Sequence, residues 1–388
     1  MFIKLALRPN LIYPLQYLIW NAIRDIETTL INYFFNFSNS SIYCFLMFFG
    51  EFLSALIIFT YQKKFWMKKR NKPKTDHYHL PILSTKDRFL KQKDSPIKII
   101  FLIFICAFDD FLQFFLYFHL SKFINISTTL GPRLYAIYTI IIALLYYYTL
   151  KFPLYRHHFF SLFMIGICLI LVITFEFIFQ EINIFLSYVE FLLALFIVFM
   201  IILCKVTLVL TEKYLYEFDN YDPFKALLYE GIFGLVLLII YLIFNNPFKS
   251  LLLIYEKNSK SNFAIFIIAL FIYVILSGGK NSFRMITTKI FTPMTTTFID
   301  YFLNPVYMIY YFCVNEDFIK SNGEKKITQF IINLILSFCI SFFGGVYNEF
   351  IILFFCELER DTHDQVKLRA SIKESELGIV DILEEDDV

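Results

Sequence analysis

Ten long apolar runs dominate this sequence, and they constrain its fold more than any other feature. A helix that spans a lipid bilayer needs about 20 mostly apolar residues, because every backbone polar group in hydrocarbon must be hydrogen-bonded within its own segment. We therefore expect an all-α polytopic membrane protein with ten transmembrane helices. The runs lie near residues 13–35, 41–61, 98–120, 130–150, 156–179, 183–210, 226–245, 262–288, 293–314 and 328–356.

The first run is the weakest, because charged side chains interrupt it. Its polar residues recur at helical spacing on one face, which must look inward if this helix spans the membrane. They are Asn21, Asp25, Thr28 and Asn32, with Arg24 beside them. A helix that lies flat on the membrane surface is the alternative. That alternative leaves nine spans and places the two ends of the chain on opposite sides.

Composition agrees with a surface that faces lipid. Only 18% of the 388 residues are charged, and the 51 Phe and 26 Tyr are too many for one globular core. Soluble domains carry about 25% charged residues. A net charge of +2 gives no reason to expect nucleic-acid binding, which needs a clustered cationic surface. The seven cysteines lie in apolar runs without a CxxC pair, which excludes a disulfide scaffold and a zinc module. We expect no cofactor and no metal.

Lys and Arg beside membrane spans mark the cytosolic side. The connection between the second and third runs, residues 63–98, carries 12 of them, and the loops on its side hold 23 against 8 on the other. We therefore expect both termini in the cytosol, with this basic loop close to anionic lipid headgroups.

The runs also define the domain organisation. Residues 1–61 hold the first two helices, 62–97 the basic cytosolic loop, 98–180 helices three to five, 183–356 helices six to ten, and 357–388 a cytosolic tail. The tail is acidic and too poor in apolar residues to pack, so we expect disorder there, after a stretch at 357–370 that continues the last helix. Five spans in each half would make the second half an inverted repeat of the first, an architecture suited to alternating access.

The eighth run carries two cations at bilayer depth, where an ionisable group needs a partner or a water-filled cavity. Lys280 and Arg284 stand one helical turn apart and repel each other unless an anion or acidic side chains neutralise them. We expect them to bind the anionic part of a solute. The alternative is neutralisation inside the protein by Glu230, Asp300 or Asp110.

Two other pairs of adjacent residues have side chains that could bind metal or transfer protons. Asp109 and Asp110 resemble the paired carboxylates that hold magnesium in membrane prenyltransferases, but the second acidic motif of such sites is missing. His157 and His158 stand beside Arg156, where we expect a solvated cytosolic loop. The sequence has no nucleophile elbow, Walker loop or HExxH motif, which disfavours hydrolytic and ATP-driven mechanisms.

Several strings resemble one transporter family, the solute carrier 35 F-type proteins of the drug/metabolite transporter superfamily. The first three of them are similar to that family's connection between its sixth and seventh spans, and the others to its third, eighth and ninth spans. The strings are Thr211-Glu212-Lys213, Tyr221-Asp222-Pro223, Tyr229-Glu230-Gly231-Ile232-Phe233-Gly234, Ala107-Phe108-Asp109-Asp110, Asn281 to Arg284 and Leu303-Asn304-Pro305.

The resemblance implies an EamA-like fold of two inverted five-helix repeats, no enzymatic activity, and movement of a small polar metabolite. Because the family is related to nucleotide-sugar transporters, it favours an endomembrane, such as Golgi, ER or vacuole, over the plasma membrane. We expect secondary-active transport of a nucleotide-sugar-like solute or organic anion by alternating access. A homodimer is left open.

We place the solute near the bilayer midplane, in a cavity lined by the first, third, seventh, eighth and ninth helices. The expected solute-binding side chains are Lys280, Arg284, Asn281, Asn304 and Asp300, and the expected charge-balancing or proton-coupling side chains are Asp110, Glu230, Glu51 and Asp25. Gly231 and Gly234 are expected to permit close helix packing. The alternatives are a non-transporting scaffold or receptor whose polar residues are all paired, and a lipid-modifying enzyme.

Overall fold

The computed structural model describes most of the chain outside its long connections. The described residues are 3–5, 11–35, 37, 39–68, 95–121, 131–150, 154–179, 188–217, 219, 221–244, 255, 260–303, 305–306, 308–309, 323–354, 357–362, 365 and 369. Most of the predicted basic loop, the acidic tail after residue 370 and the predicted solute ligand Asn304 lie outside this part of the chain.

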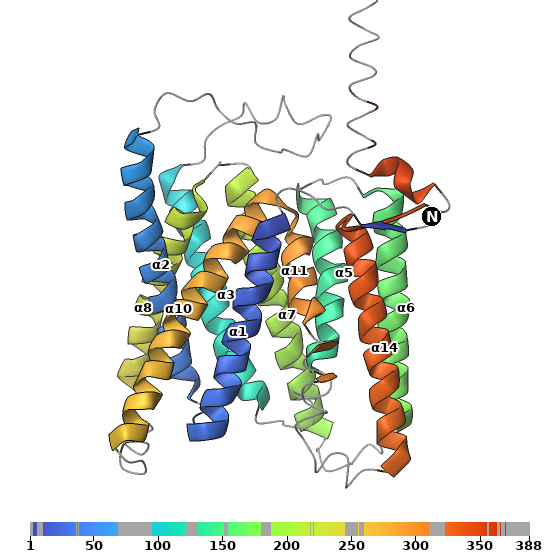
Figure 1. Cartoon of the computed structure of the whole chain (residues 1–388), viewed down its shortest axis with the longest axis horizontal. Coiled ribbons are helices and arrows are strands. Elements are labelled where there is room, and N and C mark those ends of the chain that lie inside the picture. Colours follow the sequence, from blue (N-terminus) through green and yellow to red (C-terminus); the bar gives the residue numbers. More distant parts are fainter. Residues whose placement is uncertain are drawn as a thin grey trace, which may run out of the picture.

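Within the described residues, ten α-helices stand side by side in one bundle (Figure 1). They are α1 (Ile12–Phe35), α2 (Ser40–Lys68), α3 (Pro96–Ser121), α5 (Gly131–Leu150), α6 (Arg156–Phe179), α7 (Tyr188–Glu217), α8 (Pro223–Phe244), α10 (Lys260–Ile290), α11 (Pro293–Phe302) and α14 (Gly323–Tyr347). Two strands, β1 (Ile3–Leu5) and β2 (Ile351–Leu353), and the 3-10 helix η2 (Leu358–Asp361) complete the described elements.

Each helix overlaps one of the predicted apolar runs, because these runs can satisfy their backbone hydrogen bonds within one segment. Helix α11, however, covers only the first ten residues of the run predicted at 293–314. Five of the helices, α2, α3, α8, α10 and α14, contain stretches that are long and apolar enough to cross a membrane. Helices α5 and α6 contain shorter apolar stretches. Helix α11 ends at Phe302, just before Asn304-Pro305, because a proline disfavours helical geometry at the residue before it.

Large apolar side chains cover the outer faces of the helices. Phe101 on α3, Phe163 and Ile170 on α6 and Ile243 on α8 are all at least 60% exposed. A soluble monomer rarely exposes contiguous apolar patches larger than a few hundred Å². Together with the long apolar helices, this surface identifies an all-α membrane protein.

The bundle is organised by pairs of helices that pack along each other. Helix α1 packs along α10, and α3 packs along α7. Helix α2 contacts both α8 and α10, while α6 packs on α14 and α5 on α11. Every one of these pairs joins a helix from the first five to a helix from the last five.

Glycines allow the backbones of α2, α8 and α10 to approach closely. A Cβ atom added to Gly278 would lie 2.5 Å from the carbonyl oxygen of Gly50, and one added to Gly231 would lie 2.8 Å from the backbone nitrogen of Phe52. A Cβ on Gly234 would overlap the Phe48 ring. The packing role predicted for Gly231 and Gly234 is therefore confirmed, and Gly50 and Gly278 share it.

The end of α14 differs from the prediction. The predicted span to residue 356 and its continuation through 357–370 are wrong as far as the described residues reach, because α14 ends at Tyr347. Two backbone N–H groups turn back to close the helix: Asn348 donates to Gly344 O at 3.1 Å and Phe350 to Gly345 O at 2.9 Å. Glu349 takes a left-handed conformation with φ 56°, which stops the helix there.

The chain then runs into β2, which pairs antiparallel with β1 near the N-terminus, Ile3 opposite Leu353. This pair of three-residue strands is a small addition to the all-α bundle, and it lies at one end of the helices (Figure 1). Arg156 at the start of α6 reaches Glu357 at 3.2 Å, so the segment that leads into η2 is held against the same end.

Candidate functional site

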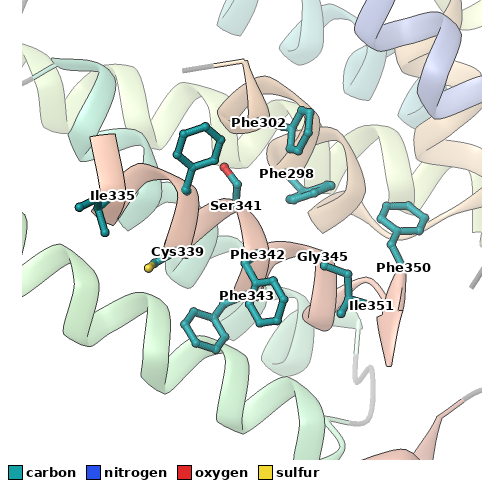
Figure 2. Close-up of a pocket in the computed structure, with 11 residues that line it drawn as sticks. Phe298, Phe302, Ile335, Cys339, Ser341, Phe342, Phe343, Gly345, Phe350 and Ile351 are labelled. Atoms are coloured by element: carbon teal, nitrogen blue, oxygen red, sulfur yellow. The ribbon is translucent and has the colours of Figure 1, made fainter. Parts of the chain in front are cut away.

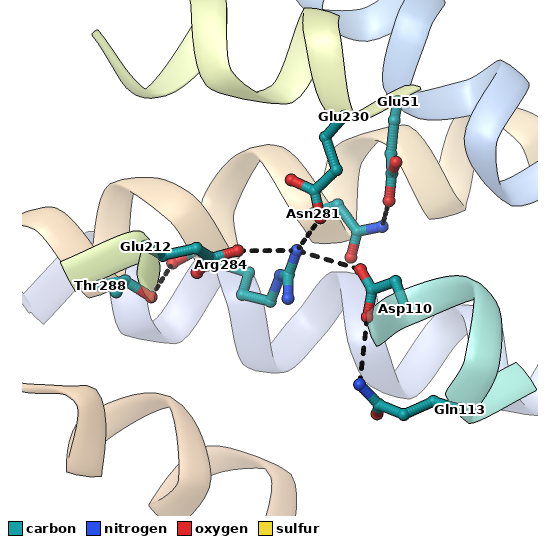
Figure 3. A network of polar contacts seen from close by, with 8 residues as sticks. All are labelled: Glu51, Asp110, Gln113, Glu212, Glu230, Asn281, Arg284 and Thr288. Carbon is teal, nitrogen blue, oxygen red and sulfur yellow. Dashed lines mark hydrogen bonds and ion pairs between the residues drawn. The ribbon is translucent and has the colours of Figure 1, made fainter. Parts of the chain in front are cut away.

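Arg284 of α10 lies at the centre of a buried polar network (Figure 3). Its Nη2 atom is 3.0 Å from Oε1 of Glu212, 3.5 Å from Oε1 of Glu230 and 3.5 Å from Oδ2 of Asp110. The carboxylates come from α7, α8 and α3, and the Arg284 side chain is only 9% exposed. Neutralisation of Arg284 by Glu230 and Asp110, the alternative recognised in the sequence, is the arrangement found.

Glu51 extends the same network from α2. It is fully buried beside Gly50 and accepts a short hydrogen bond from the Asn281 side chain (Figure 3). Gln113 donates to Asp110 at 3.5 Å. We refer to Glu51, Asp110, Glu212, Glu230, Asn281 and Arg284 as the acid network. One guanidinium faces four carboxyl groups there, so the network has a formal excess of negative charge that protons or cations must balance.

A second polar group lies where α1, α10 and α11 meet. Asp300 of α11 accepts a hydrogen bond from the Tyr17 hydroxyl at 2.6 Å and one from the Asn21 side chain at 3.3 Å. Both donors come from α1, so the polar face of α1 looks into the bundle at this level. Asn32, at the far end of that face, is exposed and accepts a hydrogen bond from Tyr43 at 3.2 Å.

Lys280 is the partly buried cation of this second group. Its charged neighbours are Arg24, Asp300, Asp25 and Lys205, yet it makes no hydrogen bond and no ion pair with any described residue. We refer to Tyr17, Asn21, Arg24, Asp25, Lys205, Lys280 and Asp300 as the lysine group. Three cations face two carboxylates in it, so its formal balance is positive, opposite to that of the acid network.

The remaining charges of the lysine group have identified contacts. Asp25 forms an ion pair with its neighbour Arg24, with Nη2 and Oδ1 2.6 Å apart. Lys205 of α7 stands over the rings of Tyr117 and Tyr138, 6.0 Å and 5.7 Å from their centroids. The predicted solute-binding and coupling residues thus fall into two groups, with Asn281 and Arg284 in the acid network and Lys280 and Asp300 in the lysine group.

The paired aspartates of α3 point to different partners. Asp109 accepts a hydrogen bond from Thr207 of α7 at 2.5 Å, whereas Asp110 turns to Arg284. Two carboxylates that diverge in this way do not form a common magnesium site. The geometry of Asp109 and Asp110 therefore does not support the resemblance to the magnesium sites of prenyltransferases.

Sequence reasoning did not assign a site role to Glu212, Tyr17 or Lys205. Tyr17 lies one helical turn before Asn21, so extending the polar face by four residues would have found it. Glu212 entered the sequence analysis only as part of the string Thr211-Glu212-Lys213, which gave it no role in a site. Its neighbour Lys213 caps α10 instead, since its Nζ donates to the carbonyl oxygens of Thr288 at 3.1 Å and Phe291 at 2.6 Å.

A large pocket has no residue of either polar group in its lining. It has a volume of about 670 Å³ between α11 and α14, beside β2, and aromatic side chains such as Phe298, Phe302, Phe342 and Phe350 line it (Figure 2). This lining suits hydrocarbon and not a polar solute. The central cavity expected from the sequence remains a prediction.

His157 and His158 are not in a solvated loop, which corrects the sequence interpretation. They occupy the first turn of α6 and are only 2% and 4% exposed, because Glu349, Tyr347 and Tyr155 pack around them.

A scan against models of known protein families gives no match, and a search of curated proteins gives no relative. The resemblance to solute carrier 35 F-type proteins therefore rests on the quoted motifs alone.

Proposed function

We propose that this protein is a secondary-active carrier that moves a small anionic metabolite across a membrane by alternating access. The observation that carries the proposal is Lys280, a cation inside the helical bundle that makes no hydrogen bond or ion pair with any described side chain, although Asp300 and Asp25 lie near it. A positive group at bilayer depth without an ion-pair partner is costly unless a ligand or water supplies one. An anionic solute at the lysine group would do so.

Helix packing supports the two inverted five-helix repeats of such a carrier. If α1, α2, α3, α5 and α6 are exchanged in order with α7, α8, α10, α11 and α14, the pair α1–α10 becomes α7–α3. The pairs α2–α8, α5–α11 and α6–α14 are unchanged. All of these pairs occur in the bundle. Because each half has an odd number of helices, the second half crosses the membrane in the opposite orientation to the first. Many carriers whose halves rock about a central site have this inverted architecture.

The two polar groups suggest a division of labour within this mechanism. The lysine group, with its positive balance, would hold the anionic part of the solute through Lys280, while Tyr17 and Asn21 keep Asp300 in place. The acid network would bind the coupling proton, because four carboxyl groups in a low dielectric cannot all stay ionised around one guanidinium. Arg284 contacts carboxylates from both halves, so movement between the halves would change its partners.

The pairing of β1 with β2 supports an even number of crossings. Both strands lie at one end of the bundle, so the chain between them returns to the side from which it started. Ten spans satisfy this condition, whereas nine do not. The excess of Lys and Arg in the predicted cytosolic loops supports the proposal that both termini face the cytosol.

A non-transporting scaffold is the second candidate, and the pairing of Arg284 favours it. Three carboxylates within 3.5 Å could make the acid network a permanent link among α3, α7, α8 and α10. A scaffold would bind no solute at Lys280, so a test at that residue separates the two candidates.

A thermal-shift screen with nucleotide sugars, nucleotides and organic anions tests the proposal, because a bound solute stabilises the folded state by mass action. We expect at least one anion class to raise the Tm of the purified protein, and the Lys280→Gln variant to lose that shift. Lys289→Gln, on the same helix but outside the lysine group, should keep it. An equal shift in Lys280→Gln, or no shift with any of the compounds, would contradict the proposal.

A further inference from the structure

The aromatic pocket between α11 and α14 has no role in the proposed transport. Its volume is about 670 Å³, within the range of about 300–1,000 Å³ that small-molecule sites have. Phe302, Ile335 and Phe338 line the pocket and are 43%, 56% and 52% exposed. The pocket is therefore a groove that opens on the outer surface of the bundle, where a membrane protein meets lipid (Figure 2).

Packed aromatic rings give the groove its shape. The Phe298 ring of α11 contacts the rings of Phe302 and Phe350, with centroids 5.7 Å and 5.9 Å apart. Gly344 of α14 lets Phe298 approach that helix closely, because a Cβ atom at Gly344 would lie 2.5 Å from the Phe298 ring. Side chains that hold one another in this way form a wall against which a ligand can pack.

The length of the groove matches one leaflet of a bilayer. On α14 its lining runs from Ile335 to Gly345, a rise of about 15 Å along the helix. The hydrocarbon core of a bilayer is about 30 Å thick, so one leaflet contributes about half of that. The lining lies within the apolar stretch Phe330–Tyr347 and continues to Ile351 of β2. The groove therefore follows α14 at the depth of the leaflet that is nearer to β1 and β2.

The lining favours hydrocarbon over any polar ligand. Ser341 carries the only hydroxyl among the described lining residues, and its oxygen is buried, so a ligand meets carbon almost everywhere. A polar ligand would lose its hydration in the groove without gaining hydrogen bonds. Inside a membrane, packing decides association, because lipid tails are as apolar as the protein surface. A lipid chain in a groove gains dispersion contacts on several sides, whereas a chain on a smooth helix face gains them on one.

We propose that the groove between α11 and α14 binds one acyl chain of a membrane phospholipid, whose headgroup lies at the end of the bundle that carries β1 and β2. Three observations carry this inference: the groove opens towards lipid, its length is that of one leaflet, and its lining is hydrocarbon. The inference depends on the membrane character of the fold and not on transport, because the lining shares no residue with the acid network or the lysine group.

Photocrosslinking of the full chain in phosphatidylcholine liposomes tests the proposal. The probe is phosphatidylcholine with a diazirine on one acyl chain, and mass spectrometry of the digested protein locates the adducts. We expect at least about fivefold more label between Ile335 and Gly345 than on the exposed α6 face from Phe163 to Ile170. Ile335→Trp fills the mouth of the groove and should remove this excess. Ile170→Trp adds the same ring at an exposed position outside the lining and should keep it.

A sterol that carries a diazirine separates the lipid classes and needs no variant. It should label the faces of α14 and α6 alike, and Ser341→Ala should leave the phospholipid label unchanged, because an acyl chain has no group that bonds to a hydroxyl. The proposal is overturned if the phospholipid labels both helices equally, or if the sterol shows the excess in its place. It is equally overturned if Ile335→Trp, shown to be folded by its Tm, keeps the full excess. The label on the unaltered chain decides the matter if that variant does not fold.

Discussion

Arg284 on α10 and Asp110 on α3 lie 3.5 Å apart, from Nη2 to Oδ2, and this ion pair joins the first five helices to the last five. The other two carboxylates within reach of Arg284, those of Glu212 and Glu230, belong to its own half of the chain. The Arg284 guanidinium thus contacts two carboxylates of its own half and one carboxylate of the other half. In the proposed mechanism this shared contact breaks and reforms as the halves rock.

The two cations of α10 should respond differently to neutralisation. Arg284→Gln leaves buried carboxylates without a counterion and should lower the free energy of unfolding by about 3–5 kcal/mol. Lys280→Gln removes a cation that has no ion-pair partner among the described residues, so its effect should stay within about 1 kcal/mol. Thermal unfolding of both variants in detergent measures the difference. Equal destabilisation by the two substitutions would refute the division into two groups.

The hydrogen bond from Tyr17 to Asp300 should contribute measurably to stability. Tyr17→Phe removes the hydroxyl that lies 2.6 Å from the carboxylate and should cost about 1.5–3 kcal/mol, as for hydrogen bonds to charged groups. Tyr33, whose side chain is largely exposed on the same helix, provides a matched control. Tyr33→Phe should change the unfolding free energy by less than about 0.5 kcal/mol. Equal free energies of unfolding for the two variants would show that the hydrogen bond from Tyr17 to Asp300 does not stabilise the packing of α1.

The close contact between α2 and α10 predicts a strong effect of one methyl group. In Gly50→Ala the new Cβ would meet the carbonyl oxygen of Val274 and lie 3.1 Å from the nitrogen of Gly278, so two backbones must separate. We expect a loss of about 1–3 kcal/mol or more. Gly166→Ala is the control, because its Cβ meets only the Ile140 side chain at 3.9 Å and should stabilise α6 by up to about 1 kcal/mol. Comparable unfolding curves would show that α2 and α10 do not pack this tightly.

The β1–β2 pair predicts that both ends of the chain lie on one side of the membrane. Tags at the two termini should be equally accessible to protease or antibody, and both should face the cytosol. Selective opening of one membrane face, with a lumenal marker to report leakage, makes the measurement. Protection of one tag while the other is digested would point to nine spans and a surface-lying α1.

The sequence predicted the helices well and their contacts less well. Apolar length is imposed by the bilayer, so the runs could be located without any tertiary information. Two partners of Arg284, Glu230 and Asp110, were among the counterions considered from the sequence, but so was Asp300, which does not pair with it, because only the packing decides which carboxylates face α10. For the same reason Glu212 was overlooked although it is the closest carboxylate.

The terminal segments illustrate a different limit. The strands β1 and β2 are three residues long and nearly the whole chain apart, so no local pattern reveals that they pair. The burial of His157 was missed because adjacent Arg156 suggested solvent, whereas the tertiary contact with Glu349 excludes it. Local sequence predicts helices, because a helix satisfies its backbone hydrogen bonds within one segment. It does not reveal tertiary contacts between residues that are far apart in the chain.

Exchange of labelled nucleotide sugars and organic anions by the purified protein in liposomes tests the central claim most directly. The account predicts saturable exchange of at least one anion, a rate at least about tenfold lower in Lys280→Gln, and an unchanged rate in Lys289→Gln. Exchange no faster than in protein-free liposomes, or full activity in the Lys280→Gln variant, would contradict it.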